Sequence, residues 1–295
     1  MASSIKRFIV RYGWAYVFIS MPVLLFFVFK IYPIISAFIM SFQRYGVMRS
    51  TWIGTDNYFE VITDPIFWRA LRVTLVYTAG TVPVNIGISF ILAWLISSQH
   101  KRLHNLFKGA FYLPSVTSGV TTALVWLWIF NPTNQGLLNR FLALFGIDNI
   151  IWLGTSKTAL FSLMLMTYLG SHGPAIVLYM AAMGGIPDSL YEAADIDGAS
   201  KWAKMRYVTL PLLKPTSLYL LVTGIISSFQ VWNNVYLMTS GGPNFATTTL
   251  AYYIYNTAFH YFDFGRASAM SFLLAIIIVV TSLVQYKYLS SNVEY

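Results

Sequence analysis

Cysteine is absent from this chain of 295 residues, and charged residues of either sign are scarce. Without cysteine, disulfide bonds and cysteine-based metal or redox centres are excluded. Charged residues make up only 10% of the chain, whereas soluble domains carry about 25%. Because 57% of the residues are hydrophobic, the composition instead indicates a polytopic, all-α membrane protein with the lipid bilayer as its solvent.

The apolar runs of the chain predict six transmembrane helices in a single transmembrane domain covering 1–295. A hydrocarbon core about 30 Å thick needs roughly 20 mostly apolar residues for each helical span. Runs of that length lie near 14–41, 71–96, 108–130, 158–183, 216–238 and 266–289. An even number of spans places both termini on the same side of the membrane.

Basic residues are distributed unequally between the two sets of loops. Eleven fall on one side: Lys6, Arg7, Arg11, Lys101, Arg102, Lys108, Lys201, Lys204, Arg206, Lys214 and Lys287. Five fall on the other: Arg44, Arg49, Arg69, Arg140 and Lys157. Cytoplasmic loops carry the excess of Lys and Arg, so the termini and the 184–215 loop are predicted to be cytoplasmic. This bias also accounts for the net charge of +9 and gives no reason to expect a nucleic-acid partner.

The 184–215 loop is the most polar long connection in the chain. Its Gly-Gly-Ile-Pro start ends a span, and Asp188 or Ser189 is placed to cap a helix beginning near Leu190. Gly198 permits a sharp turn, and a second short helix is expected at about 199–207. The two alanines of Glu192-Ala193-Ala194 leave a shallow face that another protein can approach closely.

This loop resembles the cytoplasmic EAA loop of binding-protein-dependent ABC importer permeases. The family pattern is Glu-Ala-Ala, three residues, Gly, nine residues, Ile, one residue and Leu-Pro. Here it is Glu192-Ala193-Ala194, Gly198, Val208 and Leu210-Pro211, and only Val208 departs from the pattern. Further similarity to the carbohydrate-uptake branch of this family lies in 52–78, 111–116, 129–139, 184–200, 239–250 and 264–274.

The resemblance implies a type I ABC importer permease fold and a set of partners. In that family the EAA loop forms a coupling helix seated in a groove of a cytoplasmic ATPase subunit. The coupling contact would fall on Glu192, Ala193, Ala194, Asp195, Gly198 and Ala199. The assembly would add a second permease subunit, two ATPases and an extracytoplasmic sugar-binding protein, in the bacterial cytoplasmic membrane. The chain contains no GxxxxGK[ST] phosphate loop, so no cofactor is expected on it, and ATP and Mg would be bound by the ATPases.

Polar residues inside the spans are the candidates for the substrate pathway. In the fifth span, spacings of four, three and four place Thr223, Ser227, Gln230 and Asn234 on one helical face. Ser228 and Asn233 flank this face, and Trp232 offers a ring that can stack on a sugar. The fourth span adds Thr167, Ser171 and Pro174. The resemblance implies that these two spans line most of a sugar cavity.

Each polar residue has an alternative role in hydrogen bonding between helices. For the second-span row of Thr74, Thr78, Thr81 and Asn85, this structural role is the prediction. His172 is left open between a helix break and ligand contact. The outer segment 239–249 is likewise left open between contact with the binding protein and an ordinary capped turn.

Two other functional classes are weighed against the importer. An ion-coupled secondary sugar transporter commonly uses carboxylates inside the membrane, yet every Asp and Glu here maps to a predicted loop or terminus. A membrane enzyme needs a converging set of acid, base, nucleophile or metal ligands, and four scattered histidines do not supply one. The sequence therefore favours a transport subunit without an ATP site of its own.

Overall fold

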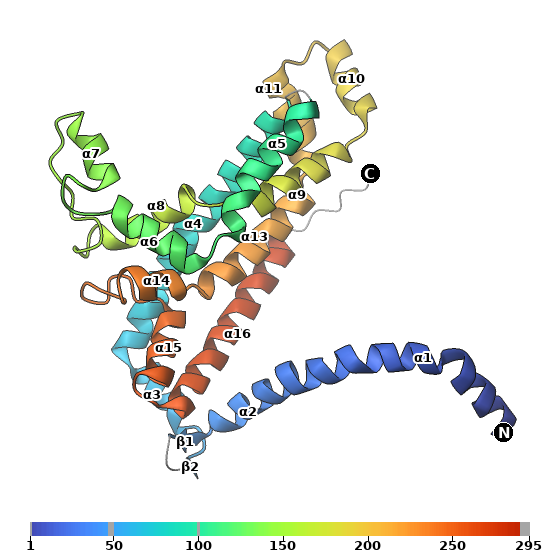
Figure 1. Ribbon diagram of the computed structural model, residues 1–295, viewed down its shortest axis with the longest axis vertical. Helices are drawn as coiled ribbons and strands as arrows, with labels where there is room; N and C mark the ends of the chain where they lie inside the picture. The colour runs from blue at the N-terminus through green and yellow to red at the C-terminus, as the bar shows by residue number, and fades with distance from the viewer. Residues whose placement is uncertain (1, 47–49, 99–100, 290–295) are drawn as a thin grey trace. The chain divides into compact units, whose positions relative to one another are not determined.

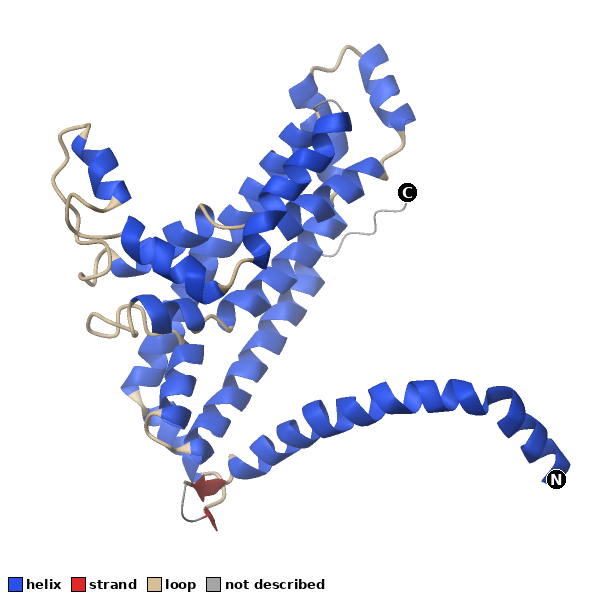
Figure 2. Ribbon diagram, in the orientation of Figure 1, coloured by secondary structure: helices blue, strands red, loops and turns tan. Residues whose placement is uncertain are grey.

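The computed structural model describes residues 2–46, 50–98 and 101–289. Helix dominates these residues, and strand is confined to one short hairpin (Figure 2). The predictions that concern Arg49 and the cytoplasmic placement of the two chain ends at Met1 and 290–295 lie outside the described residues. The chain divides into two compact units, one formed by the residues up to Thr63 with Asn256–Leu273, the other by Asp64–Tyr255 with the residues from Leu274 onward.

The first unit begins with a long apolar helix and ends in a tight corner. It contains α1 (Ala2–Phe26), a π-helical turn (Phe27–Ile31), α2 (Tyr32–Met40), β1 (Gln43–Tyr45), β2 (Ser50–Trp52) and α3 (Asp56–Thr63), with the end of α15 and the start of α16. The antiparallel hairpin pairs Gln43 with Trp52 and Tyr45 with Ser50. The stretch WIGTDNYF, residues 52–59, runs from the end of β2 into α3 and forms part of this corner.

Asn57 and Gly265 hold that corner together. The buried Asn57 side-chain amide donates to the carbonyl oxygens of Ser41, at 2.8 Å, and Gln43, at 2.9 Å. A Cβ at Gly265 would collide with the Gln43 carbonyl oxygen, so only glycine lets the start of α16 approach β1 this closely. The residues of the hairpin and the Phe264-Gly265-Arg266-Ala267 stretch therefore pack against each other and stabilise this corner.

The second unit is built around α4 (Pro65–Ser97), the 33-residue helix around which the other segments pack in Figure 1. Asp64 caps it, with its Oδ1 accepting from the Ile66 amide at 2.8 Å, and Pro65 occupies the first position, where its missing N–H costs nothing. The helix begins six residues before the predicted span, which started at 71, so Arg69, predicted to be a loop residue, belongs to its first turns.

The remaining helices of the second unit follow in chain order. They are α5 (Lys101–Tyr112), a 3-10 turn (Leu113–Val116), α6 (Gly119–Ile129), α7 (Leu137–Ala143), α8 (Ala159–Tyr168), α9 (Gly173–Gly184), α10 (Asp188–Ile196), α11 (Lys201–Lys204), a π-helical turn (Met205–Thr209), α12 (Leu210–Leu212), α13 (Lys214–Phe229) and α14 (Asn233–Met238). The start of α15 (Leu250–Phe259) and the end of α16 (Phe264–Leu289) complete it. Helices α9 and α13 both pack along α4.

Four hydrogen bonds attach other segments to α4. The Thr74 hydroxyl accepts from the Leu250 amide at 2.8 Å, and the Ser228 hydroxyl donates to Thr78 at 2.9 Å. The Gly80 carbonyl accepts from the Tyr168 hydroxyl at 2.9 Å, and Ser89 bonds to His172 at 3.2 Å. These four bonds, here named the α4 anchor bonds, reach α15, α13, α8 and the residues just before α9.

Three of the predicted spans are continuous and three are not. Tyr12–Met40, Pro65–Ser97 and Phe264–Tyr288 are each long and apolar enough to cross a membrane. The predicted span 108–130 is wrong as a straight helix, because the chain turns by 94° between Leu103–Val116 and Gly119–Ile129. Pro114 and the non-helical residues 117–118 cause this break.

The other two broken segments have different causes. At 158–183, α8 and α9 meet at 43° across residues 169–172, as the Gly170, Gly173 and Pro174 set predicts. The predicted span 216–238 is wrong as one helix, since α13 ends at Phe229 and α14 begins at Asn233. It is α13 and the preceding Lys201–Leu212 that pass the hydropathy test together, with a 65° bend.

Candidate functional site

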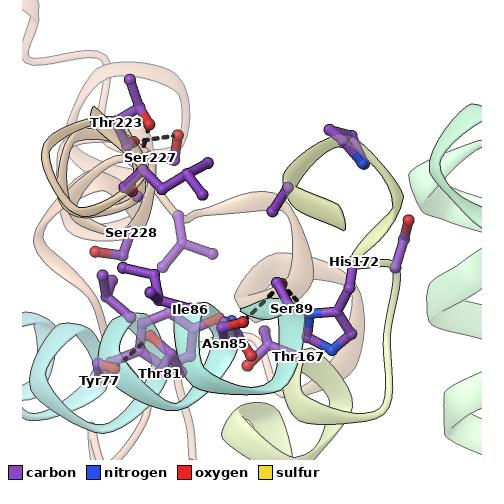
Figure 3. Close-up of a pocket in the computed structure, with 17 residues that line it drawn as sticks. Tyr77, Thr81, Asn85, Ile86, Ser89, Thr167, His172, Thr223, Ser227 and Ser228 are labelled. Carbon is purple, nitrogen blue, oxygen red and sulfur yellow. Dashed lines mark hydrogen bonds between the residues drawn. The ribbon is translucent and has the colours of Figure 1, made fainter. Parts of the chain in front are cut away.

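A cavity of about 390 Å³, with polar side chains set in a mainly apolar lining, lies between α4, α8, α9 and α13 (Figure 3). Its size is within the range of about 300–1,000 Å³ that is usual for ligand pockets. The α4 wall presents Tyr77, Thr81, Asn85 and Ser89, four residues apart and hence on one face of the helix. The α13 wall presents Thr223, Ser227 and Ser228.

The third wall is the break between α8 and α9. His172 is buried, its Nε2 donates to the Tyr168 carbonyl at 2.9 Å, and its Nδ1 lies 3.2 Å from the Ser89 hydroxyl. A Cβ at Gly173 would lie 2.5 Å from the Tyr112 Cα, so this glycine permits the close approach of α5. His172 therefore stands at the helix break and also lines the cavity, so both of the roles left open for it remain open.

The lining of the cavity is uncharged. It consists of hydroxyl groups, one carboxamide, His172 and aliphatic or aromatic carbon, with no carboxylate, lysine or arginine among the lining residues. The Asn85 Oδ1 is shielded from solvent and has no hydrogen-bond partner within the described residues. A buried acceptor without a donor is costly, and the residue that carries it is part of the cavity lining.

The structure brings together six of the ten predicted pathway residues. They are Thr167, Ser171, Pro174, Thr223, Ser227 and Ser228. The remaining four, Gln230, Trp232, Asn233 and Asn234, do not line the cavity.

The predicted polar face running from Thr223 to Asn234 is wrong. Its helical spacing fails because residues 230–232 are not helical, which rotates everything after Phe229 to a different direction. Trp232 stacks on Tyr255 with ring centroids 4.6 Å apart. Asn233 opens α14, which packs against α6.

The structural role predicted for the second-span row holds for its first half only. Thr74 and Thr78 form two of the α4 anchor bonds. Thr81 and Asn85 instead line the cavity, so the purely structural prediction for them is wrong. Ser89 was missed altogether, although it extends the same four-residue spacing along α4.

The cytoplasmic loop predicted between 184 and 215 is a closed, folded unit. Helix α10 starts at Asp188, two residues before the predicted start, and neither Asp188 nor Ser189 caps it because Pro187 occupies the cap position. The predicted second helix at 199–207 is wrong in extent. Only Lys201–Lys204 is α-helical there, and the π-helical turn and α12 carry the helix on to Leu212. Gly198 has the positive φ, +71°, that the sharp turn was expected to need.

Two contacts close this loop. Lys204 pairs with Asp195, joining α11 to α10, and the Tyr191 hydroxyl lies 2.9 Å from the Thr209 hydroxyl. The Ser200 hydroxyl accepts from the Ala203 amide and caps α11. This ion pair joins the two short helices, while the Asp195 side chain stays 63% exposed, so its predicted contact with an ATPase stays a prediction.

The surface of α10 is left open for another molecule. Glu192 and Ala193 are exposed, whereas Ala194 and Ala199 are partly buried. Ile196 is 88% exposed, an unusual state for a large aliphatic side chain on a polar helix. The sequence interpretation missed Ile196, although it follows Ala193 by three residues and therefore shares its helical face.

The outer segment 239–249 is a rigid, hydrogen-bonded loop. Thr247, Thr248 and Thr249 are buried, and their hydroxyls donate to the carbonyls of Gly242, Gly241 and Val231. Phe245 remains 45% exposed, with the Arg69 guanidinium 5.8 Å from its ring centroid. The loop is thus more than a simple capped turn, and its contact with a binding protein stays a prediction.

The helical membrane architecture, the polar cavity and the closed EAA loop together define a permease component of a transport system. The chain belongs to the family described as binding-protein-dependent transport system inner membrane component, whose model matches residues 85–292. The recognition made from the EAA motif is confirmed.

Three relatives share almost the full chain. The arabinooligosaccharides transport system permease protein AraP of Bacillus subtilis (strain 168) is 35% identical over 92% of this chain and 87% of its own length. The lactose transport system permease protein LacF of Rhizobium radiobacter is 32% identical over 96% of both chains. The trehalose/maltose transport system permease protein MalF of Thermococcus litoralis is 30% identical over 88% of both.

A solved structure supports the fold. A chain of a bacterial ABC transporter involved in the import of the acidic polysaccharide alginate superposes with a TM-score of 0.85 at 24% identity, over 96% of this chain and 97% of that one. The chain therefore has the ABC importer permease fold.

Proposed function

We propose that this chain is a permease subunit of an ABC importer that moves an uncharged oligosaccharide into the cytoplasm. The observation that carries the substrate class is the uncharged cavity with the unpartnered Asn85 oxygen on its α4 wall. Sugar hydroxyls donate and accept hydrogen bonds, so they match this lining of hydroxyls and one carboxamide. Relatives named for arabinooligosaccharide, lactose and trehalose or maltose transport support the same class.

The EAA loop is proposed to couple the cavity to ATP hydrolysis. Glu192, Ala193, Ala194, Gly198 and Ala199 would contact the ATPase subunit, with Ile196 entering its groove as an apolar anchor. Asp195, predicted to be a contact residue, serves in this proposal to hold α10 against α11 through Lys204.

The full assembly proposed has six spans in this chain, which acts as a single permease domain with both ends in the cytoplasm. It adds a second permease subunit, two ATPases that bind ATP and Mg, and an extracytoplasmic sugar-binding protein, in the bacterial cytoplasmic membrane. The alternative of an ion-coupled secondary transporter is disfavoured, because no carboxylate lines the cavity. Gln230, Trp232, Asn233 and Asn234 are no longer proposed to line the substrate path.

The test is ATP hydrolysis by the reconstituted complex with sugar-loaded binding protein. Arabinooligosaccharides, lactose, maltose and galactooligosaccharides represent neutral substrates, and alginate oligosaccharides represent charged ones. Stimulation by one neutral sugar supports the proposal. Stimulation by the charged sugars alone, or a failure to assemble with any ATPase, contradicts it.

A variant tests the cavity itself. Asn85→Leu keeps the side-chain volume but removes the acceptor, so we expect the half-saturating sugar concentration for uptake to rise roughly 3–10-fold. Asn149→Leu is the matched control, since Asn149 is exposed and lies away from the cavity. Equal uptake by the Asn85→Leu variant and the wild type would remove Asn85 from the substrate path.

A further inference from the structure

A second hollow, of about 590 Å³, lies along α4 and the first half of α13, with Tyr288 of α16 among its lining residues. We name it the α4–α13 groove. Its α4 side is formed by Pro83, Ile86, Gly87 and Phe90, and its other side by Leu210 of α12 and by Lys214, Ser217, Leu218 and Leu221 of α13. The volume lies within the range of about 300–1,000 Å³ that ligand pockets occupy.

The floor of the groove is open because of glycine. A Cβ built at Gly87 meets no other atom within 4 Å, and Pro83 one turn earlier carries only a compact ring. The α4 helix therefore offers a smooth apolar channel that a long, narrow hydrocarbon chain can fill. A larger side chain at position 87 would fill the same space without displacing the protein.

Charge is present at one point of the groove. Lys214 is exposed, no carboxylate lines the groove, and the part of the chain that the structure describes shows no ion pair to it. Lys214 is also the first residue of α13, where the helix dipole adds positive partial charge. The polar groups of Tyr179 and Ser217 are already satisfied by each other at 2.9 Å. The groove therefore suits a ligand with an apolar tail and one anionic head.

We propose that the α4–α13 groove binds an anionic phospholipid, with an acyl chain over Gly87 and the phosphate beside Lys214. The proposal rests on the membrane topology given above, which places the start of α13 and the end of α16 at the cytoplasmic face. Basic pockets between transmembrane helices on that face bind anionic head groups. A helix of the partner permease could also cover the leucines, but an apolar helix would leave the Lys214 ammonium without a counter-charge.

The experiment measures retained lipid by native mass spectrometry. The permease complex is equilibrated in nanodiscs of equal parts phosphatidylglycerol and phosphatidylcholine, then released and weighed. We expect the wild type to retain phosphatidylglycerol above its share of the bilayer. In Lys214→Gln this preference falls roughly five-fold, the effect of one lysine near an anionic surface. In Gly87→Phe, retention of both lipids falls because the groove is filled.

Two matched controls separate the groove from general effects. Lys157→Gln removes an exposed lysine of the predicted outer side, and Gly109→Phe adds the same ring at another helical glycine with open space. Both should retain lipid as the wild type does. Equal retention of the two lipids by the wild type would overturn the proposal. A Gly87→Phe variant that keeps its lipid but loses the second permease would also overturn it and show a subunit interface instead.

Lipid retention is read without transport, so this test is independent of the proposed function. If the complex prefers phosphatidylglycerol but ATP hydrolysis never responds to sugar, the groove proposal is supported and the proposed substrate class is contradicted. If ATP hydrolysis responds to sugar but the complex shows no lipid preference, the proposed function is supported and the groove proposal is contradicted.

Discussion

Replacing Gly198 tests whether the EAA loop works through its backbone conformation. This glycine has φ at +71°, where residues with a Cβ are disfavoured, yet a Cβ built there meets nothing within 4 Å. The cost of a substitution in the free chain therefore comes from the backbone alone. An L-residue in the left-handed region costs roughly 1–2 kcal/mol.

This cost predicts a graded series. Asn is enriched several-fold among non-glycine residues with positive φ, and β-branched residues are the rarest there. We expect activity in the order Gly198, Gly198→Asn, Gly198→Ala and Gly198→Val. A penalty of about 1–2 kcal/mol lowers the population of the native turn relative to alternatives about 5–30-fold.

The assay is sugar-stimulated ATP hydrolysis by the assembled complex, with co-purification of the ATPase as a second measure. Gly109→Ala is the control, because Gly109 has open space and an ordinary helical φ. Wild-type activity in the Gly198→Val variant would refute the reasoning. Equal loss in the Asn and Val variants would also refute it, since the side-chain volume rather than the backbone would then be at fault.

Two further predictions concern the highly exposed Ile196 and the fully buried Asn139. Ile196→Asp should weaken co-purification of the ATPase about 10–100-fold, since a buried isoleucine contributes roughly 1.5–3 kcal/mol. Leu144→Asp should not, because Leu144 is also highly exposed, at 78%, but lies on the predicted outer side. Unchanged co-purification would contradict the anchor role. Asn139→Ala should destabilise the outer region by about 2–5 kcal/mol, because the Trp152 indole and the Ile150 amide lose their common acceptor. Thermal unfolding measures this loss against Asn149→Ala, and equal midpoints would contradict it.

The long helices could be predicted from the sequence, but the breaks between shorter ones only in part. Apolar runs predict the continuous helices, since length and hydropathy are local properties. The α8–α9 bend was also predictable, because glycines and a proline gather there. The break after Phe229 has no such marker in residues 230–232, and the contact seen there, the stacking of Trp232 on Tyr255, joins residues that are distant in sequence.

The candidate site shows the same division. The EAA loop follows from the spacing of its glycine, alanines and acid, all of them within one segment. The α4 wall of the cavity could not be predicted in this way. Thr74 and Asn85 belong to one periodic row along α4, and only the residues packed opposite them distinguish their roles. Thr74 accepts from the Leu250 amide, whereas Asn85 is one of the residues that line the cavity. Sequence periodicity identifies a face but not what lies opposite it.

The α4 anchor bonds limit how the second unit can change shape. Each joins α4 to another segment at a separation of 2.8–3.2 Å, and hydrogen bonds weaken steeply with small displacements. Any motion that preserves all four anchor bonds must move α4, α8 and α13 together as a rigid body. Flexing is then left to joints that carry no anchor bond, at Leu213 and at residues 230–232. A pair of cysteines bridging the joint at Leu213, which does not line the cavity, would restrict bending there, whereas the joint at 230–232 includes the cavity residue Val231.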